Sequence, residues 1–175
     1  MIGDKIRKAI NDQIKYEIES SYLYLAMAAY FHSKSLDGMA QWMRVQVQEE
    51  LFHAMKFFDH VRDRDGRVEL KPLSIDKNDW ASPQEAFRDA YKHEQSVTAR
   101  INQLSKLAQE EGDFAAQAML QWFVTEQVEE EANTSKITDQ LALVGDNGYG
   151  ILMLDRELGT RTFVLPATTA GAAAP

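Results

Sequence analysis

The chain of 175 residues contains no cysteine. This absence excludes disulfide bonds, thiolate zinc sites, iron–sulfur clusters and a cysteine nucleophile, and it suits a reducing compartment. Basic residues are also in short supply, with 19 Lys and Arg against 27 Asp and Glu and a net charge of −8. The acidic balance disfavours nucleic acid and anionic membranes as partners and favours cations.

Long apolar runs are missing as well. The longest, Tyr22–Phe31, is too short to cross a bilayer, and the first residues lack the apolar core of a secretion signal. We therefore expect a cytoplasmic protein with no membrane partner. The length fits one domain, which we place at residues 1–160, and the low-complexity end over 161–175 is expected to be a disordered tail.

What the chain does contain is helical periodicity. Apolar residues recur at intervals of three and four over about 4–34, 38–64, 83–111 and 114–144. A short fifth segment follows over 147–158, and it is too short to be stable unless it docks on the rest. These segments predict a protein built only of helices.

The connections between these segments complete the predicted fold. Asp4 and Asp113 can cap the first and fourth helices, and Ser82 with Glu85 forms a capping box before the third. Residues 65–82 lack periodicity, and a crossover along a bundle explains so long a connection. We predict an all-α four-helix bundle with one long crossover between helices 2 and 3 and a short fifth helix.

All four apolar stripes are interrupted near their middle by polar side chains. The interrupting residues are, in chain order, Glu17, Glu50 and His53, Glu94, and Gln127 and Glu130. Glu50 and His53 are three positions apart and so share one helix face. A carboxylate buried alone costs roughly several kcal/mol unless it is paired or bound to a metal. Either these side chains form one polar layer in the bundle, or each is a surface charge and all four stripes are misplaced alike.

Such a layer is a candidate metal site. Clustered carboxylates repel one another and need a divalent cation or shared protons to stay buried. Several carboxylates with a single imidazole suit iron or manganese better than copper, and they lack the His or Cys set usual for zinc. The number of carboxylates suggests two metal ions bridged by shared oxygens.

Four motifs carry a resemblance to a known family. They are Tyr16-Glu17-Ile18-Glu19-Ser20-Ser21, Gln48-Glu49-Glu50-Leu51-Phe52-His53, Tyr91-Lys92-His93-Glu94-Gln95 and Thr125-Glu126-Gln127-Val128-Glu129-Glu130-Glu131. In this order and spacing the chain resembles the ferritin-like di-iron carboxylate proteins, and more narrowly the non-haem prokaryotic ferritins, from about residue 3 to 160. The resemblance implies iron storage in a hollow shell of twenty-four copies. It also implies a ferroxidase centre in each subunit that oxidises Fe²⁺ with O₂ or H₂O₂ and delivers Fe³⁺ to an oxide mineral.

The resemblance also implies roles for the interrupting residues. The first iron would be held by Glu17, Glu50 and His53, and the second by Glu50, Glu94 and Glu130, with Gln127 beside it. Tyr24 is two turns from Glu17 on the same face, where it would donate an electron or a hydrogen bond. The alternative for Tyr24 is an ordinary core tyrosine.

Two departures separate the chain from related families. Bacterioferritins and rubrerythrins carry a second Glu-x-x-His on the fourth helix, whereas this chain has no histidine there, so we expect a loosely held second iron. Bacterioferritins also bind haem through a methionine after the glutamate of the Glu-x-x-His motif, where this chain has Leu51. No haem is therefore expected.

Further acids lie beside the dinuclear set. Glu126, Glu129 and Glu130 fall within about one helical turn, and Glu49 is next to Glu50. The resemblance suggests that Glu49, Glu126 and Glu129 contribute to a third iron site, and the alternative is a solvated acidic face.

Other functions stay open at this point. A rubrerythrin-like peroxide reductase would need a cysteine-containing domain, and a metal-free helical scaffold would show no bound metal. The apolar stretch Tyr22–Phe31 covers every side of its helix, which indicates a partner subunit. The sequence does not determine the preferred oxidant, the routes of iron or the electron donor for its release.

Overall fold

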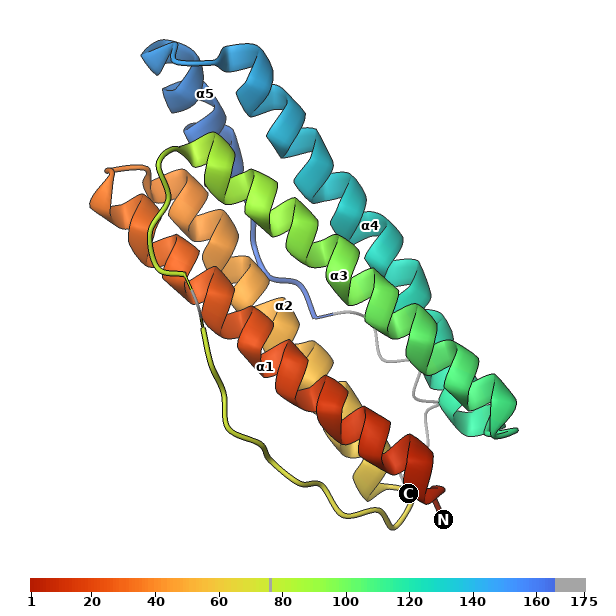
Figure 1. Cartoon of the computed structure of the whole chain (residues 1–175). Helices are drawn as coiled ribbons and strands as arrows, with labels where there is room; N and C mark the ends of the chain where they lie inside the picture. Colours follow the sequence, from red (N-terminus) through yellow and green to blue (C-terminus); the bar gives the residue numbers. More distant parts are fainter. Residues whose placement is uncertain (76, 166–175) are drawn as a thin grey trace, which may run out of the picture.

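The computed structural model describes residues 1–75 and 77–165, and this part of the chain contains five helices (Figure 1). They are α1 (Asp4–Ser33), α2 (Asp37–Arg62), α3 (Pro83–Glu110), α4 (Phe114–Val144) and α5 (Gly148–Leu158). The first four run side by side as an elongated bundle, and α5 packs against α2 and α4 at one end. The predicted all-α bundle, with its crossover and short fifth helix, is confirmed.

Helices α3 and α4 begin at the capping residues that the sequence predicts. The Ser82 hydroxyl accepts from the Glu85 N–H at 3.1 Å, and the Glu85 carboxylate accepts from the Ala81 N–H at 2.6 Å. The Asp113 carboxylate accepts from the Ala116 N–H at 3.0 Å. Because these side chains satisfy amides that lack a partner within the helix, α3 and α4 begin at fixed positions.

The start of α1 differs from the expectation. Gly3, not Asp4, is the N-cap residue, and no side chain in the described part of the chain caps the helix. Asp4 is the first helical residue, where its negative charge interacts favourably with the helix dipole. The other difference is small, since α2 ends at Arg62, two residues before the expected end.

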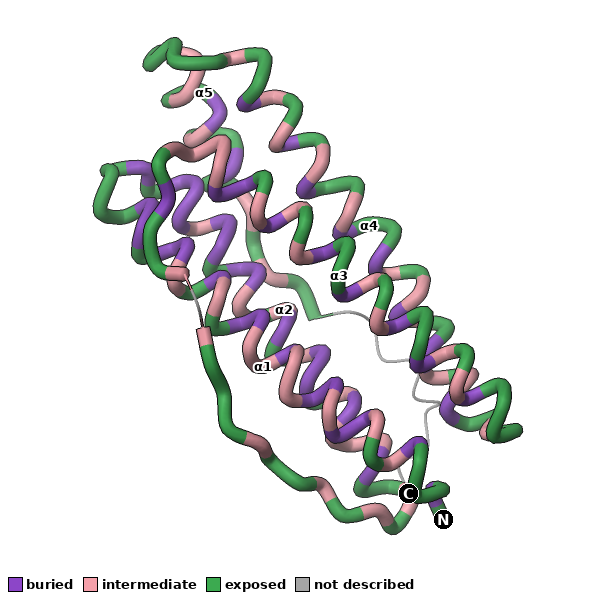
Figure 2. The backbone as a smooth tube through the Cα atoms, viewed as in Figure 1, coloured by how far each residue is buried: buried purple, intermediate pink, exposed green. Residues whose placement is uncertain are grey.

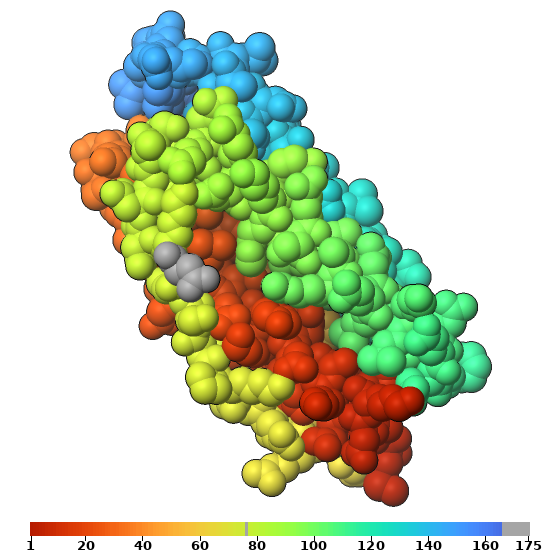
Figure 3. Space-filling view, in the orientation of Figure 1, coloured from red at the N-terminus to blue at the C-terminus, as the bar shows by residue number. Residues whose placement is uncertain are grey.

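The crossover between α2 and α3 runs along the bundle beside α1 (Figures 1 and 3). The buried Asn11 of α1 anchors it, donating to the Arg67 carbonyl at 3.1 Å and accepting from the Glu69 N–H at 2.9 Å. Lys71 adds an ion pair with Asp12. These contacts fix the path of the long connection. It carries the chain from the end of α2 to the opposite end of the bundle, where α3 begins.

The buried side of each helix faces the bundle axis (Figure 2). Two hydrophobic clusters fill the interior. One contains Tyr24, Phe31, Phe87, Leu141 and Leu154, and the other contains Ile10, Phe57, Ile101, Leu120 and Phe123. The four predicted apolar stripes are all buried, and their polar interruptions lie between the two clusters along each helix. The bundle therefore has a polar layer at mid-length.

Part of the apolar segment in α1 faces outward. Tyr22 is 51% exposed and Leu25 is 49% exposed. Within the described residues, no helix is long and apolar enough to cross a membrane. The predicted disordered tail covers residues 161–175. Its first residue, Arg161, is bound to Glu49 of α2 at 2.6 Å, whereas residues 166–175 lie outside the described part.

Candidate metal centre

The polar layer brings together side chains from all four long helices. Its predicted members are each at most 3% exposed: Glu17, Glu50, His53, Glu94, Gln127 and Glu130. The layer divides into two halves, one carried by α1 and α2 and the other by α3 and α4.

The α1/α2 half consists of Glu17, Glu50 and His53. One ligand atom from each of them lies within 4.8 Å of the others. Among the described residues, Glu17 Oε2 and Glu50 Oε2 have no hydrogen-bond partner. A buried carboxylate oxygen without a partner is costly, so these two oxygens present a ready place for a cation.

His53 supplies the nitrogen of this half. Its Nδ1 is 3.7 Å from Glu50 Oε2, and Trp122 and Phe123 pack edge-on against its ring at centroid distances of 5.4 and 5.6 Å. Burial lowers the pKa of His53 below its usual value. The imidazole is therefore neutral near pH 7, the form that binds metals.

The α3/α4 half differs because its carboxylates already have partners. The Tyr24 hydroxyl donates to Glu94 Oε1, and Gln127 Nε2 donates to Glu94 Oε2 at 3.2 Å. Glu130 Oε2 accepts from Gln46 Nε2 at 2.7 Å. Metal ions at these oxygens must compete with hydrogen bonds from the protein.

The electrostatics of the layer favour a cation. Burial, followed by the charges of Glu94 and Glu17, raises the pKa of Glu50 well above its usual value. Burial, followed by the charge of Glu130, raises the pKa of Glu94 to about 8. Burial and the charge of Glu94 also raise the pKa of Tyr24, so its hydroxyl stays protonated. The acids cannot all ionise together at neutral pH unless a metal ion compensates their charge.

The layer also contains two glutamines that the sequence analysis did not predict. Gln13 donates to Glu17 Oε1 at 2.8 Å and is 4% exposed, while Gln46 is completely buried. Each lies four positions before a predicted ligand, Glu17 or Glu50, on the same helix face. A glutamine one turn before a ligand on an apolar stripe is the signal that would have identified them.

Of the three acids predicted for a third site, two lie near the polar layer and one is exposed. Glu49 forms an ion pair with Arg161 at 2.6 Å, yet burial outweighs this and raises its pKa to about 7. Burial and the charge of Glu130 raise the pKa of Glu126. Glu129 is exposed. Glu49 and Glu126 therefore both lie in the field of Glu130, whereas Glu129 faces outward.

The donor set fits a hard or borderline divalent ion. It offers carboxylate oxygens and one neutral imidazole at the α1/α2 half, and carboxylate and amide groups at the α3/α4 half. Such oxygen-rich ligands match iron or manganese.

The chain is similar to known proteins over most of its length. A family profile of the ferritin-like domain matches residues 7–144. A bacterial non-heme ferritin of Staphylococcus aureus is 37% identical over 163 residues, which cover 93% of this chain and 98% of that protein. The counterpart in Staphylococcus haemolyticus is 36% identical with the same coverage. The crystal structure of an open-pore ferritin from Archaeoglobus fulgidus is 49% identical, with a TM-score of 0.91 over 93% of this chain and 100% of that one.

Proposed function

The chain belongs to the ferritin family, and from this membership we propose which of its residues bind and oxidise iron. Ferritins store iron and oxidise Fe²⁺, so the protein is an iron-storage protein with ferroxidase activity. The observation that carries the proposal is the buried group Glu17, Glu50 and His53 with two unpartnered carboxylate oxygens. The domain that does this work is proposed to span residues 1–160, and its place of action is the cytoplasm.

The first Fe²⁺ binds at the α1/α2 half. Glu17 and Glu50 supply oxygens that no donor among residues 1–75 and 77–165 contacts, and His53 supplies a neutral nitrogen. Gln13 holds the other oxygen of Glu17 and so orients the free one. This ion enters a site whose ligands are already close together, which lowers the entropic cost of binding.

The second Fe²⁺ binds between Glu50, Glu94 and Glu130, with Gln127 beside it. Glu50 bridges the two ions and releases its proton when they arrive, because its pKa is raised only while the positive charge is absent. The hydrogen bonds of Glu94 and Glu130 must be broken or rearranged. The second ion is therefore held more loosely and moves on more readily after oxidation.

Oxidation removes one electron from each of the two Fe²⁺ ions. The two electrons and two protons convert O₂ to H₂O₂, or H₂O₂ to two molecules of water. Tyr24 keeps its proton in the metal-free protein, and its hydroxyl donates a hydrogen bond to Glu94. Its hydroxyl thus orients Glu94, and its ring is near enough to the centre to supply a further electron.

A third iron site involves Glu49, Glu126 and Glu129, and the resulting Fe³⁺ passes through it to the mineral. Replacing all three by Ala should preserve the binding of two ions and remove a third. The ratio of iron oxidised to oxygen consumed should change as well. A triple variant that matches the parent in both measurements would show that these acids are only surface charge.

The stored mineral needs an enclosure, for which we propose a shell of twenty-four chains. The outward-facing Tyr22 and Leu25 support it, as does an apolar groove beside α5 lined by Leu143, Val144 and Met153. Analytical ultracentrifugation at micromolar concentration tests this assembly. A monomer or dimer would overturn both the shell and the enclosed mineral.

The decisive experiment on the centre uses Glu50→Ala and His53→Ala. Both variants should lose rapid Fe²⁺ oxidation in stopped-flow measurements and keep the circular dichroism spectrum of the helical fold. Glu110→Ala, an exposed acid at the end of α3, is the matched control and should oxidise iron at the parent rate. Unchanged oxidation in both test variants would show that the centre lies elsewhere.

A further inference from the structure

A single arginine beyond α5 returns to the side of the metal centre. Arg161 follows α5 by three residues, and its guanidinium lies against α2. Its Nη1 donates to Gln46 Oε1 at 2.5 Å and its Nη2 donates to Glu49 Oε2 at 2.6 Å. The segment after α5 is thereby connected to the helix that carries Glu50.

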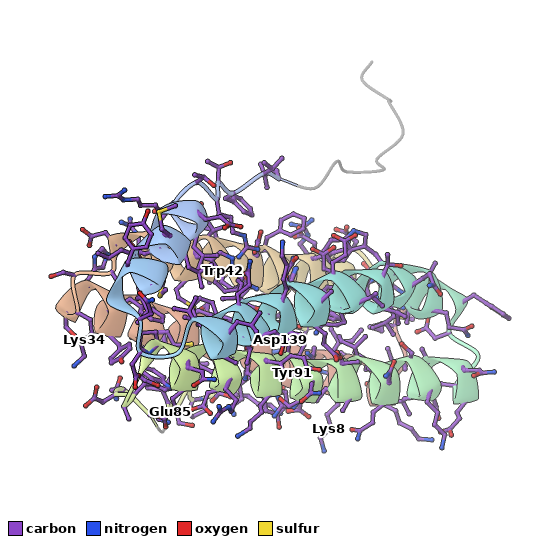
Figure 4. All side chains as sticks on the ribbon, turned by 90° about the horizontal axis from the view of Figure 1, so that it is seen from above. Lys8, Lys34, Trp42, Glu85, Tyr91 and Asp139 are labelled. Carbon is purple, nitrogen blue, oxygen red and sulfur yellow. The ribbon has the colours of Figure 1, made fainter. Side chains whose placement is uncertain are left out.

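One face of α2 is built to receive this side chain. Trp42, Gln46 and Glu49 follow one another at intervals of four and three and so share that face. The Arg161 guanidinium carbon lies over the Trp42 ring at 4.4 Å from its centroid, and Figure 4 shows Trp42 on α2 close to α5. A flat guanidinium stacks on an indole while its edge donates to a carbonyl and a carboxylate, which a lysine cannot reproduce.

The contact also reaches a proposed iron ligand. Gln46 is completely buried, and its Nε2 donates to Glu130 Oε2 at 2.7 Å. Because Arg161 holds the amide oxygen of Gln46, the NH₂ group must point toward Glu130. The guanidinium is therefore one side chain away from the dinuclear centre.

We propose that Arg161 is the resident cation of Glu49, beside the dinuclear centre, and that a metal ion binds to Glu49 only by displacing it. This inference rests on the proposed third site. Two cations at one carboxylate repel each other strongly where little water screens them. Displacement requires space, and a cavity of about 260 Å³ beside Arg161, lined also by Trp42 and Asn133, provides it.

Displacement has a consequence for the second iron ligand. When the guanidinium leaves, Gln46 loses the contact that fixes its amide, and Glu130 is freed to turn toward a metal ion. The segment after α5 thus couples occupation of the third site to the position of Glu130. A merely structural arginine, which anchors the segment to α2, would not affect metal binding.

Anaerobic calorimetric titration of the metal-free protein with Co²⁺ tests the proposal. Arg161→Met and Arg161→Gln both remove the charge, so that the result does not depend on one variant folding. Each should bind the third ion roughly tenfold more tightly or better, because the competing charge is gone. Arg161→Lys should bind it no more tightly than the parent does.

Arg156→Met is the matched control, since Arg156 is an exposed arginine on α5, and it should behave as the parent does. Adding Glu49→Gln to Arg161→Met should abolish the gain. If the uncharged variants bind two ions normally and the third no better than the parent, the role of Arg161 is overturned and the dinuclear centre stands. If none of the proteins binds the first two ions, the proposed function fails, and this inference fails with it.

Discussion

The two halves of the polar layer are built from similar side chains, but they differ in whether the carboxylate oxygens have hydrogen-bond partners. In the α1/α2 half, Glu17 and Glu50 each keep one buried oxygen without a partner among the described residues. In the α3/α4 half, Tyr24, Gln127 and Gln46 donate hydrogen bonds to the carboxylates. The first half is incomplete without a cation, whereas the second is satisfied by the protein itself.

This difference determines how each half responds to metal. A cation at the α1/α2 half would relieve two buried oxygens that have no hydrogen-bond partner in the described part of the chain, so the whole interaction would contribute to affinity. A cation at the α3/α4 half replaces hydrogen bonds that already exist, and only the difference contributes. We therefore predict an order of binding, with a tightly held first ion and a mobile second one.

The largest expected effect comes from removing one ligand from each half. Glu17→Ala should abolish tight binding of the first ion, a loss beyond the roughly 10–100-fold that removal of an outer partner causes. Glu130→Ala should retain the first ion and lose the second. Anaerobic Co²⁺ titration measures both variants, and equal losses of both ions would contradict the difference between the halves.

The pH dependence of the metal-free protein distinguishes the halves next. Glu94 titrates near 4.5 when unfolded and near 8 when folded, so between these values the unfolded state loses its proton first. The contribution of Glu94 to the free energy of unfolding should therefore be highest below pH 4.5. It should fall as the pH rises to about 8. Urea unfolding across this range measures the slope.

Glu94→Gln serves as the control for that slope, because a neutral amide does not titrate. Its stability should depend less on pH than that of the parent protein. A saturating divalent ion should also flatten the slope in the parent, since it holds the carboxylates ionised. An identical slope in the variant would show that Glu94 does not carry the effect.

A smaller effect is expected from Tyr24→Phe, which removes one donor from the α3/α4 half. The metal-free protein should lose about 1–3 kcal/mol of stability, because a buried acceptor on Glu94 is left without its partner. The second metal ion should bind more tightly, since one competing hydrogen bond is gone. Thermal melts with and without Co²⁺ measure both effects, and Tyr149→Phe, at an exposed tyrosine, is the control. Weaker binding of the second ion would contradict the competition.

The smallest effect should come from a change far from both halves. Ser82→Ala removes the cap of α3 and should cost about 0.5–2 kcal/mol of stability. The order and affinity of metal binding should not change, because α3 is held in the bundle by its buried stripe. A changed affinity for the second ion alone would mean that the start of α3 positions Glu94.

The periodicity of the sequence was sufficient to predict much of this molecule. Four stripes with intervals of three and four placed Glu17, Glu50, His53, Glu94 and Glu130 on buried faces, and all five are buried. The capping box at Ser82 located the start of α3. These predictions succeed because helix geometry relates residues within a few positions of one another, which a single sequence records directly. The ligand roles of the five remain predictions.

Only the tertiary structure decided which carboxylates have partners. Gln46 reaches Glu130 across 84 positions, and Arg161 reaches Glu49 across 112. Tyr24 donates to Glu94 across 70 positions. Such contacts depend on the rotation and depth of one helix relative to another, and periodicity within each helix does not contain that information. The sequence therefore determined the layer of acids, and the packing of the helices determined which oxygens are left free for a metal ion.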